Sequence, residues 1–239
     1  MTHRTPVYVA LGDSISIDIY AGGPGRGGAS LLYRNRDDDF PDWSGRDLSS
    51  IQPGTAFHLL ATDGATSATV LGFQLPRLLS LGDVPTVVTL TAGGNDLLQA
   101  YGNTGAARRV IEGVVANVDQ VLTELVSLAG SDLRVAVGTV YDPSDGTGDH
   151  AALGLPPWPD GVAMIGELNA RLVELAGRHG AAVADIHGCF LGHGLTAGNA
   201  AQRDSRPRDR DLWYLGVIEP NAWGASAVRA AFWDAVTTG

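Results

Sequence analysis

The run Val7-Tyr-Val-Ala-Leu11 is continuously apolar and is followed at once by Gly12-Asp13-Ser14-Ile15-Ser16. Such a run predicts a strand that is buried on both faces, as in a parallel sheet. Its abrupt end at a glycine predicts a turn that leaves the Ser14 hydroxyl at the carboxyl end of the strand. Ligands and reacting groups collect at that end of parallel sheets, so Ser14 is a candidate nucleophile.

Strand-like and helix-like segments alternate along the rest of the chain, which predicts a mostly parallel sheet covered by helices on both faces. The expected strands are Val7–Leu11, Thr55–Ala61, Thr86–Ala92, Leu133–Val140 and Ala181–Ile186. The expected helices are Asp42–Ser50, Val70–Leu81, Ala106–Leu128, Gly161–His179 and Ala222–Val236. Two polar stretches, Gly22–Asp39 and Thr196–Asp211, interrupt the alternation. They are either solvated surface loops or lids that shape a pocket.

Composition limits the class of protein. With 239 residues, 44% of them hydrophobic, the chain has enough apolar side chains for one sizeable α/β domain spanning residues 1–239. Its net charge of −10 argues against binding to nucleic acid or to anionic lipid. All sixteen basic residues are arginine, which excludes Schiff-base chemistry on lysine and a P-loop lysine.

Several absences predict a cytoplasmic protein without a cofactor. The single cysteine, Cys189, rules out an internal disulfide and fits a reducing compartment. The few residues before the first strand leave no room for a signal peptide, and no apolar stretch has the length of a membrane span. No metal-ligand spacing is found among His3, His58, His150 and His179. The sequence carries no signal for an oligomeric state.

Two further motifs follow the next two expected strands. Asp63-Gly64-Ala65-Thr66 comes after the second strand, where a glycine lets the backbone approach a reacting carbon and point an N–H at a developing oxyanion. Gly93-Gly94-Asn95-Asp96 ends the third strand, where the Asn95 amide could donate to the same oxyanion. Taken alone, Gly64 also fits a simple turn and Asn95 a helix cap. Their shared place at strand ends, together with Ser14, favours an oxyanion hole.

Ser14, Gly64 and Asn95, in this order, resemble the motifs of the GDSL/SGNH hydrolase family, and the similarity extends to the helix expected at Ala222–Val236. The resemblance implies a flavodoxin-like three-layer α/β/α sandwich with a five-stranded parallel sheet. It implies that Ser14 is the nucleophile, with an oxyanion hole made by the backbone N–H groups of Ser14 and Gly64 and by the Asn95 side chain. Asn169 resembles a helix position of structural importance. Family members hydrolyse esters, thioesters and amides, so a small acyl compound is the expected substrate.

The last motif of the family is altered in this chain. The family has Asp-x-x-His-Pro-Asn, in which the histidine deprotonates the serine and the aspartate orients the histidine. This chain has Gly216-Val-Ile-Glu219-Pro220-Asn221, with Gly216 at the aspartate position and Glu219 at the histidine position. Pro220, Asn221 and Gly224, which shape the turn and the start of the last helix, are kept.

Three hypotheses account for the missing histidine. His193, in a glycine-flanked loop beyond the fifth strand, could be the base with Glu219 orienting it, because a triad is defined by geometry and not by sequence order. Glu219 could itself be the base if burial beside Trp213 or Trp223 raised its pKa above the ordinary value of ~4.3. The chain could also be an acyl-ligand binding protein without catalysis. An acyltransferase that uses the same acyl-serine intermediate is an alternative within enzymes.

Three other segments suggest binding sites only weakly. Asp37-Asp38-Asp39 fits a solvated acidic loop, because three adjacent side chains cannot all face one cation. Gly22–Gly28 is rich in glycine but lacks the Lys-Ser/Thr of a P-loop. Asp142–Asp149 resembles a calcium loop but lacks its closing glutamate, so we expect a turn-rich connection.

Overall fold

The computed structural model describes residues 5–129, 133–151, 154–195, 197, 213–215 and 218–238. Its central sheet consists of β1 (Val7–Leu11), β2 (Ala56–Leu59), β3 (Val87–Leu90), β4 (Arg134–Gly138) and β5 (Ala182–Ala184). All neighbouring strands are parallel, and their order is β2-β1-β3-β4-β5. This is the flavodoxin-like order, in which the switch point lies between β1 and β3.

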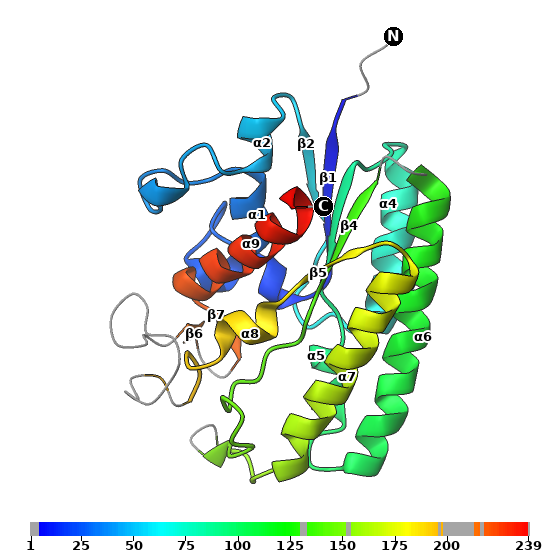
Figure 1. The fold of residues 1–239 in the computed structure, drawn as a ribbon, viewed down its shortest axis with the longest axis vertical. Helices are drawn as coiled ribbons and strands as arrows, with labels where there is room; N and C mark the ends of the chain where they lie inside the picture. The colour runs from blue at the N-terminus through cyan, green and yellow to red at the C-terminus, as the bar shows by residue number, and fades with distance from the viewer. Residues whose placement is uncertain are drawn as a thin grey trace.

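Helices cover both faces of the sheet, which confirms the expected three-layer α/β/α sandwich (Figure 1). One face carries α4 (Leu75–Leu81), α6 (Thr104–Ala129) and α7 (Pro159–Arg178). The other face carries α1 (Gly28–Tyr33), α8 (Ile186–Phe190) and α9 (Ala222–Thr237). The ends of the long helices agree with the sequence prediction to within a few residues, because their apolar side chains recur at helical spacing.

Short elements complete the chain and include most of the residues around the strand ends. They are α2 (Leu48–Ile51), α3 (Ser67–Thr69), α5 (Gly94–Gln99), the antiparallel pair β6 (Tyr214–Leu215) and β7 (Glu219–Pro220), the 3-10 turns η1 (Ser14–Ser16), η2 (Ile19–Ala21) and η3 (Pro41–Trp43), and the π-helical turn η4 (Val70–Gln74). The helix expected at 70–81 is therefore η4 followed by α4, with Pro76 tolerated in the first turn of α4.

Strand β1 is buried on both faces, as its apolar run predicts. Val9 and Leu11 belong to the core cluster on the side of α6 and α7. Tyr8 and Ala10 belong to the cluster on the side of α9. Successive side chains of a strand point to opposite faces, so one strand of five residues supplies both cores and is fixed between them.

Two local expectations are wrong. The helix expected at Asp42–Ser50 is divided into η3 and α2, because Asp47 accepts a hydrogen bond from the Ser50 backbone N–H (2.8 Å) and so starts a new helix at Leu48. The stretch Gly22–Asp39 is not irregular throughout, since it contains α1, which packs on α9. The stretch Thr196–Asp211 lies outside the described residues, apart from Ala197.

None of the described helices combines the length and the apolar character needed to cross a bilayer.

Candidate active site

The chain passes from β1 to Ser14 through a backbone conformation that requires glycine. Gly12 has φ +133°, and a Cβ there would lie 2.1 Å from Thr91 Oγ1 and 2.5 Å from the Thr91 carbonyl oxygen. Gln74 holds both backbone groups of Gly12: its Oε1 accepts from the Gly12 N–H (2.7 Å) and its Nε2 donates to the Gly12 carbonyl (2.8 Å). The ends of β1 and β3 are therefore held in close contact at the switch point of the sheet.

Ser14 is the first residue of η1 and is 6% exposed. Its neighbour Asp13 is buried and lies against β3. Thr91 Oγ1 donates to Asp13 Oδ1 (2.8 Å) and accepts from the Asp13 backbone N–H (3.1 Å). Burial raises the pKa of Asp13 to about 6, although its hydrogen bond from Thr91 acts in the opposite direction. The carboxyl group of Asp13 thus belongs to the residue next to the candidate nucleophile.

The Gly64 and Asn95 motifs are joined by direct hydrogen bonds. Asn95 Nδ2 donates to the Ala65 carbonyl (3.0 Å), one residue after Gly64, which has φ +67°. Asp96 accepts from the backbone N–H (2.9 Å) and the hydroxyl (2.6 Å) of Ser67. An amide NH₂ carries two hydrogens, so the contact with Ala65 leaves the second one on Asn95 for a ligand. Asn95 also lines the same cavity as Ser14.

Glu219 is brought to this region by the turn that precedes α9. Asn221 caps α9 by accepting from the backbone N–H groups of Trp223 (3.0 Å) and Gly224 (3.1 Å). A Cβ at Gly224 would lie 2.5 Å from the Trp213 carbonyl oxygen, so this position tolerates only glycine. The pair β6 and β7, in which Leu215 faces Glu219, completes the turn. Gly216, at the family's aspartate position, lies outside the described residues.

The half-buried carboxyl group of Glu219 interacts with Ser14. Burial raises the pKa of Glu219, a hydrogen bond with the Ser14 side chain lowers it, and the negative charges of Asp63 and Asp13 raise it further. The net direction is upward. Glu219 Oε2 is buried and has no hydrogen-bond partner among the described residues. The structure therefore brings Ser14 and Glu219 together, with further carboxylates nearby.

His193 has different surroundings. It is fully buried, and its ring is stacked on Trp213 with a centroid separation of 3.5 Å and an interplanar angle of 6°. Its backbone N–H donates to the Phe190 carbonyl (3.0 Å), and its carbonyl accepts from Trp213 (3.0 Å). It is not among the residues that line the cavity beside Ser14. The contacts described for His193 lie in the aromatic core beside α8.

Two residues of this region were missed by the sequence reasoning. The Tyr141 hydroxyl, at the end of β4, donates to the Ile218 carbonyl, one residue before Glu219. Burial and the charges of Asp13 and Glu219 raise the pKa of Tyr141 well above its ordinary range. Asp13 lies in the motif that follows β1, but the sequence pattern indicates no role for it. A position directly after a parallel strand was the only signal that could have indicated Tyr141.

The site includes a cavity of about 230 Å³ beside Ser14. Its walls come from the ends of β1, β3 and β4, from α5, from the connection between β4 and α7, and from α7 itself. Most of its lining side chains are apolar, among them Leu97, Leu98, Leu155 and Ile165. Such a cavity can hold an uncharged organic group next to the Ser14 hydroxyl.

The weaker candidate sites have structural explanations. The Asp18 carboxylate occupies the glycine-rich turn by accepting from the N–H groups of Gly25 (2.9 Å) and Gly27 (2.8 Å). Asp142 accepts from the Ser144 and Gly146 N–H groups (both 2.8 Å), as expected for a turn-rich connection. Asn169 holds both backbone groups of Val140 (2.7 and 2.8 Å), which is a structural role. Within the described residues, no cluster of side chains could hold a metal ion.

Comparison with known proteins identifies the family of this fold. A profile of the GDSL-like lipase/acylhydrolase family matches residues 10–227. The chain belongs to this family. No curated protein matches this GDSL-like chain in sequence.

Solved structures of similar fold include esterases and lipases. An extracellular lipase from Streptomyces rimosus is 23% identical, with a TM-score of 0.56, over 96% of this chain and 99% of that chain. Phospholipase A1 from Streptomyces albidoflavus is 21% identical, with a TM-score of 0.59, over 97% and 99% of the two chains. A variant of an acetyl xylan esterase from Geobacillus stearothermophilus is 13% identical, with a TM-score of 0.64, over 98% and 95%. At these identities the similarity shows the fold alone.

Proposed function

We propose that this GDSL-like protein hydrolyses esters through an acyl-serine intermediate on Ser14, with Glu219 as the general base. The proximity of η1, which begins at Ser14, to β7, which carries Glu219, together with the raised pKa of the Glu219 carboxyl group, carries the proposal. A general base is most effective when its pKa lies near the operating pH, and an ordinary glutamate is too weak a base for that role. Burial and the neighbouring carboxylates change the pKa of Glu219 in the required direction.

In the first step, the Glu219 carboxylate accepts the proton of Ser14 Oγ while Oγ bonds to the ester carbonyl carbon. The negative charge moves from Glu219 to the carbonyl oxygen, which the N–H groups of Ser14 and Gly64 and the Asn95 amide can stabilise. Protonated Glu219 then returns the proton to the leaving alcohol as the ester C–O bond breaks. Water, deprotonated by Glu219, attacks the acyl-serine, releases the carboxylic acid and restores Ser14.

Glu219 is favoured over His193 as the base because of where the two side chains make their contacts. Glu219 has Ser14, Asp13 and Asp63 in its immediate electrostatic surroundings. His193 is stacked in the aromatic core on Trp213. The surroundings of His193 therefore indicate a role in packing, whereas those of Glu219 favour a role in proton transfer.

The experiment compares Ser14→Ala, Glu219→Gln and His193→Gln on one activated short-chain ester. Ser14→Ala should abolish turnover and labelling by a fluorophosphonate probe. Glu219→Gln should lower kcat by about 10²–10⁴, the usual contribution of a general base, and His193→Gln should leave kcat within a few-fold of wild type. The wild-type rate should rise with pH through the raised pKa of Glu219, because the base acts in its ionised form.

Two outcomes would contradict the proposal in different ways. A Glu219→Gln protein with undiminished turnover, or a large loss in folded His193→Gln, would remove Glu219 from the role of base. A folded wild-type protein that neither turns over esters nor reacts with the probe would instead indicate an acyl-ligand binding protein.

A further inference from the structure

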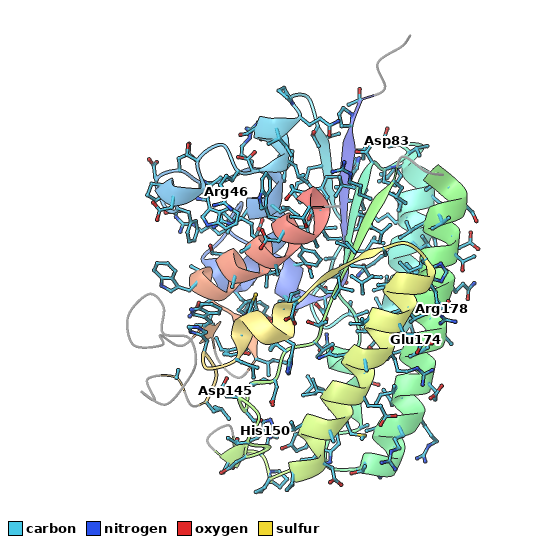
Figure 2. All side chains as sticks on the ribbon, in the orientation of Figure 1. Arg46, Asp83, Asp145, His150, Glu174 and Arg178 are labelled. Atoms are coloured by element: carbon cyan, nitrogen blue, oxygen red, sulfur yellow. The ribbon has the colours of Figure 1, made fainter. Side chains whose placement is uncertain are left out.

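The lining of the cavity beside Ser14 also includes a group of three aromatic side chains. These are Tyr101 after α5, Trp158 before α7, and His150 in the connection between β4 and α7. His150 lies near the end of the molecule at which α7 begins (Figure 2). The Tyr101 ring meets the edges of both other rings, at centroid distances of 5.6 Å to His150 and 5.2 Å to Trp158.

Two of these three residues have occupied polar atoms. The Tyr101 hydroxyl donates to the Pro156 carbonyl (2.5 Å), and Trp158 Nε1 donates to Thr104 Oγ1 (3.4 Å). They therefore present mainly ring surface to the cavity. The apolar side chains of the lining, among them Leu97 and Ile165, offer no hydrogen bonds to a ligand.

His150 differs from them. It is 8% exposed and lines the cavity, yet its Nδ1 is buried without a hydrogen-bond partner among the described residues. A neutral imidazole carries one N–H and one lone pair, and buried N–H groups without a partner are rarer in proteins than buried acceptors without one. The surroundings thus favour the tautomer with hydrogen on Nε2, which makes Nε2 the ring nitrogen able to donate to a ligand.

We propose that His150 binds a neutral oxygen on the distal part of the acyl group, so that the preferred substrate carries a hydroxyl or keto oxygen on its acyl chain instead of a plain alkyl tail. The inference rests on the proposed function, because it takes this cavity as the acyl-binding pocket. A carboxylate tail fits less well: no arginine is among the described residues that line the cavity, whereas the Asp13 carboxyl group is.

The test measures binding without turnover. In the Ser14→Ala protein, calorimetry compares methyl hexanoate with its derivatives that bear a hydroxyl or keto oxygen at successive carbons. When the oxygen is on the carbon that lies next to His150, the oxygenated ester should bind about 5–10-fold more tightly than the plain ester. This is the gain expected from one neutral hydrogen bond. Adding His150→Phe, which keeps an aromatic ring, should abolish or reverse that preference, while His150→Gln should retain part of it.

Tyr101→Phe is the matched control, because it removes a polar atom that Pro156 already occupies. The oxygen preference should survive this change. Equal or tighter binding of the plain ester at every position would overturn the inference, as would a preference that folded His150→Phe leaves unchanged. Absence of binding by all these esters would overturn it as well.

The two proposals can fail separately. Wild-type protein that hydrolyses plain and oxygenated esters equally well would retain the proposed function and remove the role of His150. Ser14→Ala protein that shows the preference, paired with an inert wild type, would keep the His150 contact and remove the hydrolysis.

Discussion

The stability of the Asp13→Asn protein relative to wild type should increase from acidic to neutral pH. Burial raises the Asp13 pKa from 3.8 to about 6 in the folded protein. The folded state therefore holds the proton more tightly than the unfolded chain does, and ionising Asp13 destabilises the fold. The two pKa values differ by about two pH units, which corresponds to about 3 kcal/mol at ~1.4 kcal/mol per unit.

The upward direction of the Asp13 pKa shift determines the pH range in which the free energy of unfolding changes. Below the unfolded pKa of 3.8 Asp13 is protonated in both states and has no effect on the free energy of unfolding. As the pH rises the unfolded chain ionises first, and the loss of stability is complete above about 6. The unfolding free energy of wild type minus that of Asp13→Asn should fall by about 2–3 kcal/mol between mildly acidic and neutral pH.

Urea unfolding of both proteins across this range provides the measurement, and taking the difference cancels groups that titrate equally in the two. Asp39→Asn is the matched control, because Arg36 and Arg26 lower the pKa of the half-buried Asp39. Wild type minus Asp39→Asn should therefore stay nearly constant between mildly acidic and neutral pH, and should fall only as the pH drops below the ordinary carboxyl pKa of 3.8. A difference between wild type and Asp13→Asn that does not vary with pH would refute the reasoning about burial.

Two other predictions concern the strand ends. Asn95→Ala should lower kcat about 10²–10³-fold with little change in KM, because its donor acts mainly on the transition state; steady-state kinetics measure this, and a change confined to KM would make Asn95 an ordinary substrate contact. Gly12→Ala should destabilise the fold by about 2–5 kcal/mol, since it combines a positive φ with overlap against Thr91. Gly82→Ala, also at positive φ but with nothing within 4 Å, should cost only about 1–2 kcal/mol in the same urea unfolding, and equal losses would contradict the steric argument.

The sheet and the long helices were predictable because each is determined locally. β1 and β3 are continuous apolar runs that end at glycine, and the apolar side chains of α6 recur at helical spacing. The same holds for Ser14 and Asn95, since a parallel sheet brings the ends of neighbouring strands together. What fixes these residues in the folded protein is their place at the β1–β3 switch point.

The surroundings of Ser14 were not predictable, because they depend on contacts between distant segments. The pKa of Asp13 reflects burial against Thr91, and Tyr141 reaches Ile218 across the site. Sequence patterns report which face a residue occupies but not how well water reaches it. The stretch at 22–39 was misread for a similar reason: α1 owes its stability to packing on α9, and its sequence shows only glycine-rich flanks.

The two changes in the last motif, Gly216 for aspartate and Glu219 for histidine, make sense as one chemical change. A histidine base becomes a cation when it takes the serine proton, so it needs a carboxylate to fix its tautomer and stabilise that charge. A glutamate base becomes neutral on the same step, has no tautomer to fix, and needs no counter-ion. It needs a raised pKa instead, which burial and the nearby Asp13 and Asp63 charges supply. An orienting aspartate is therefore dispensable once the base is a desolvated carboxylate, and glycine at position 216 is consistent with Glu219 acting as that base.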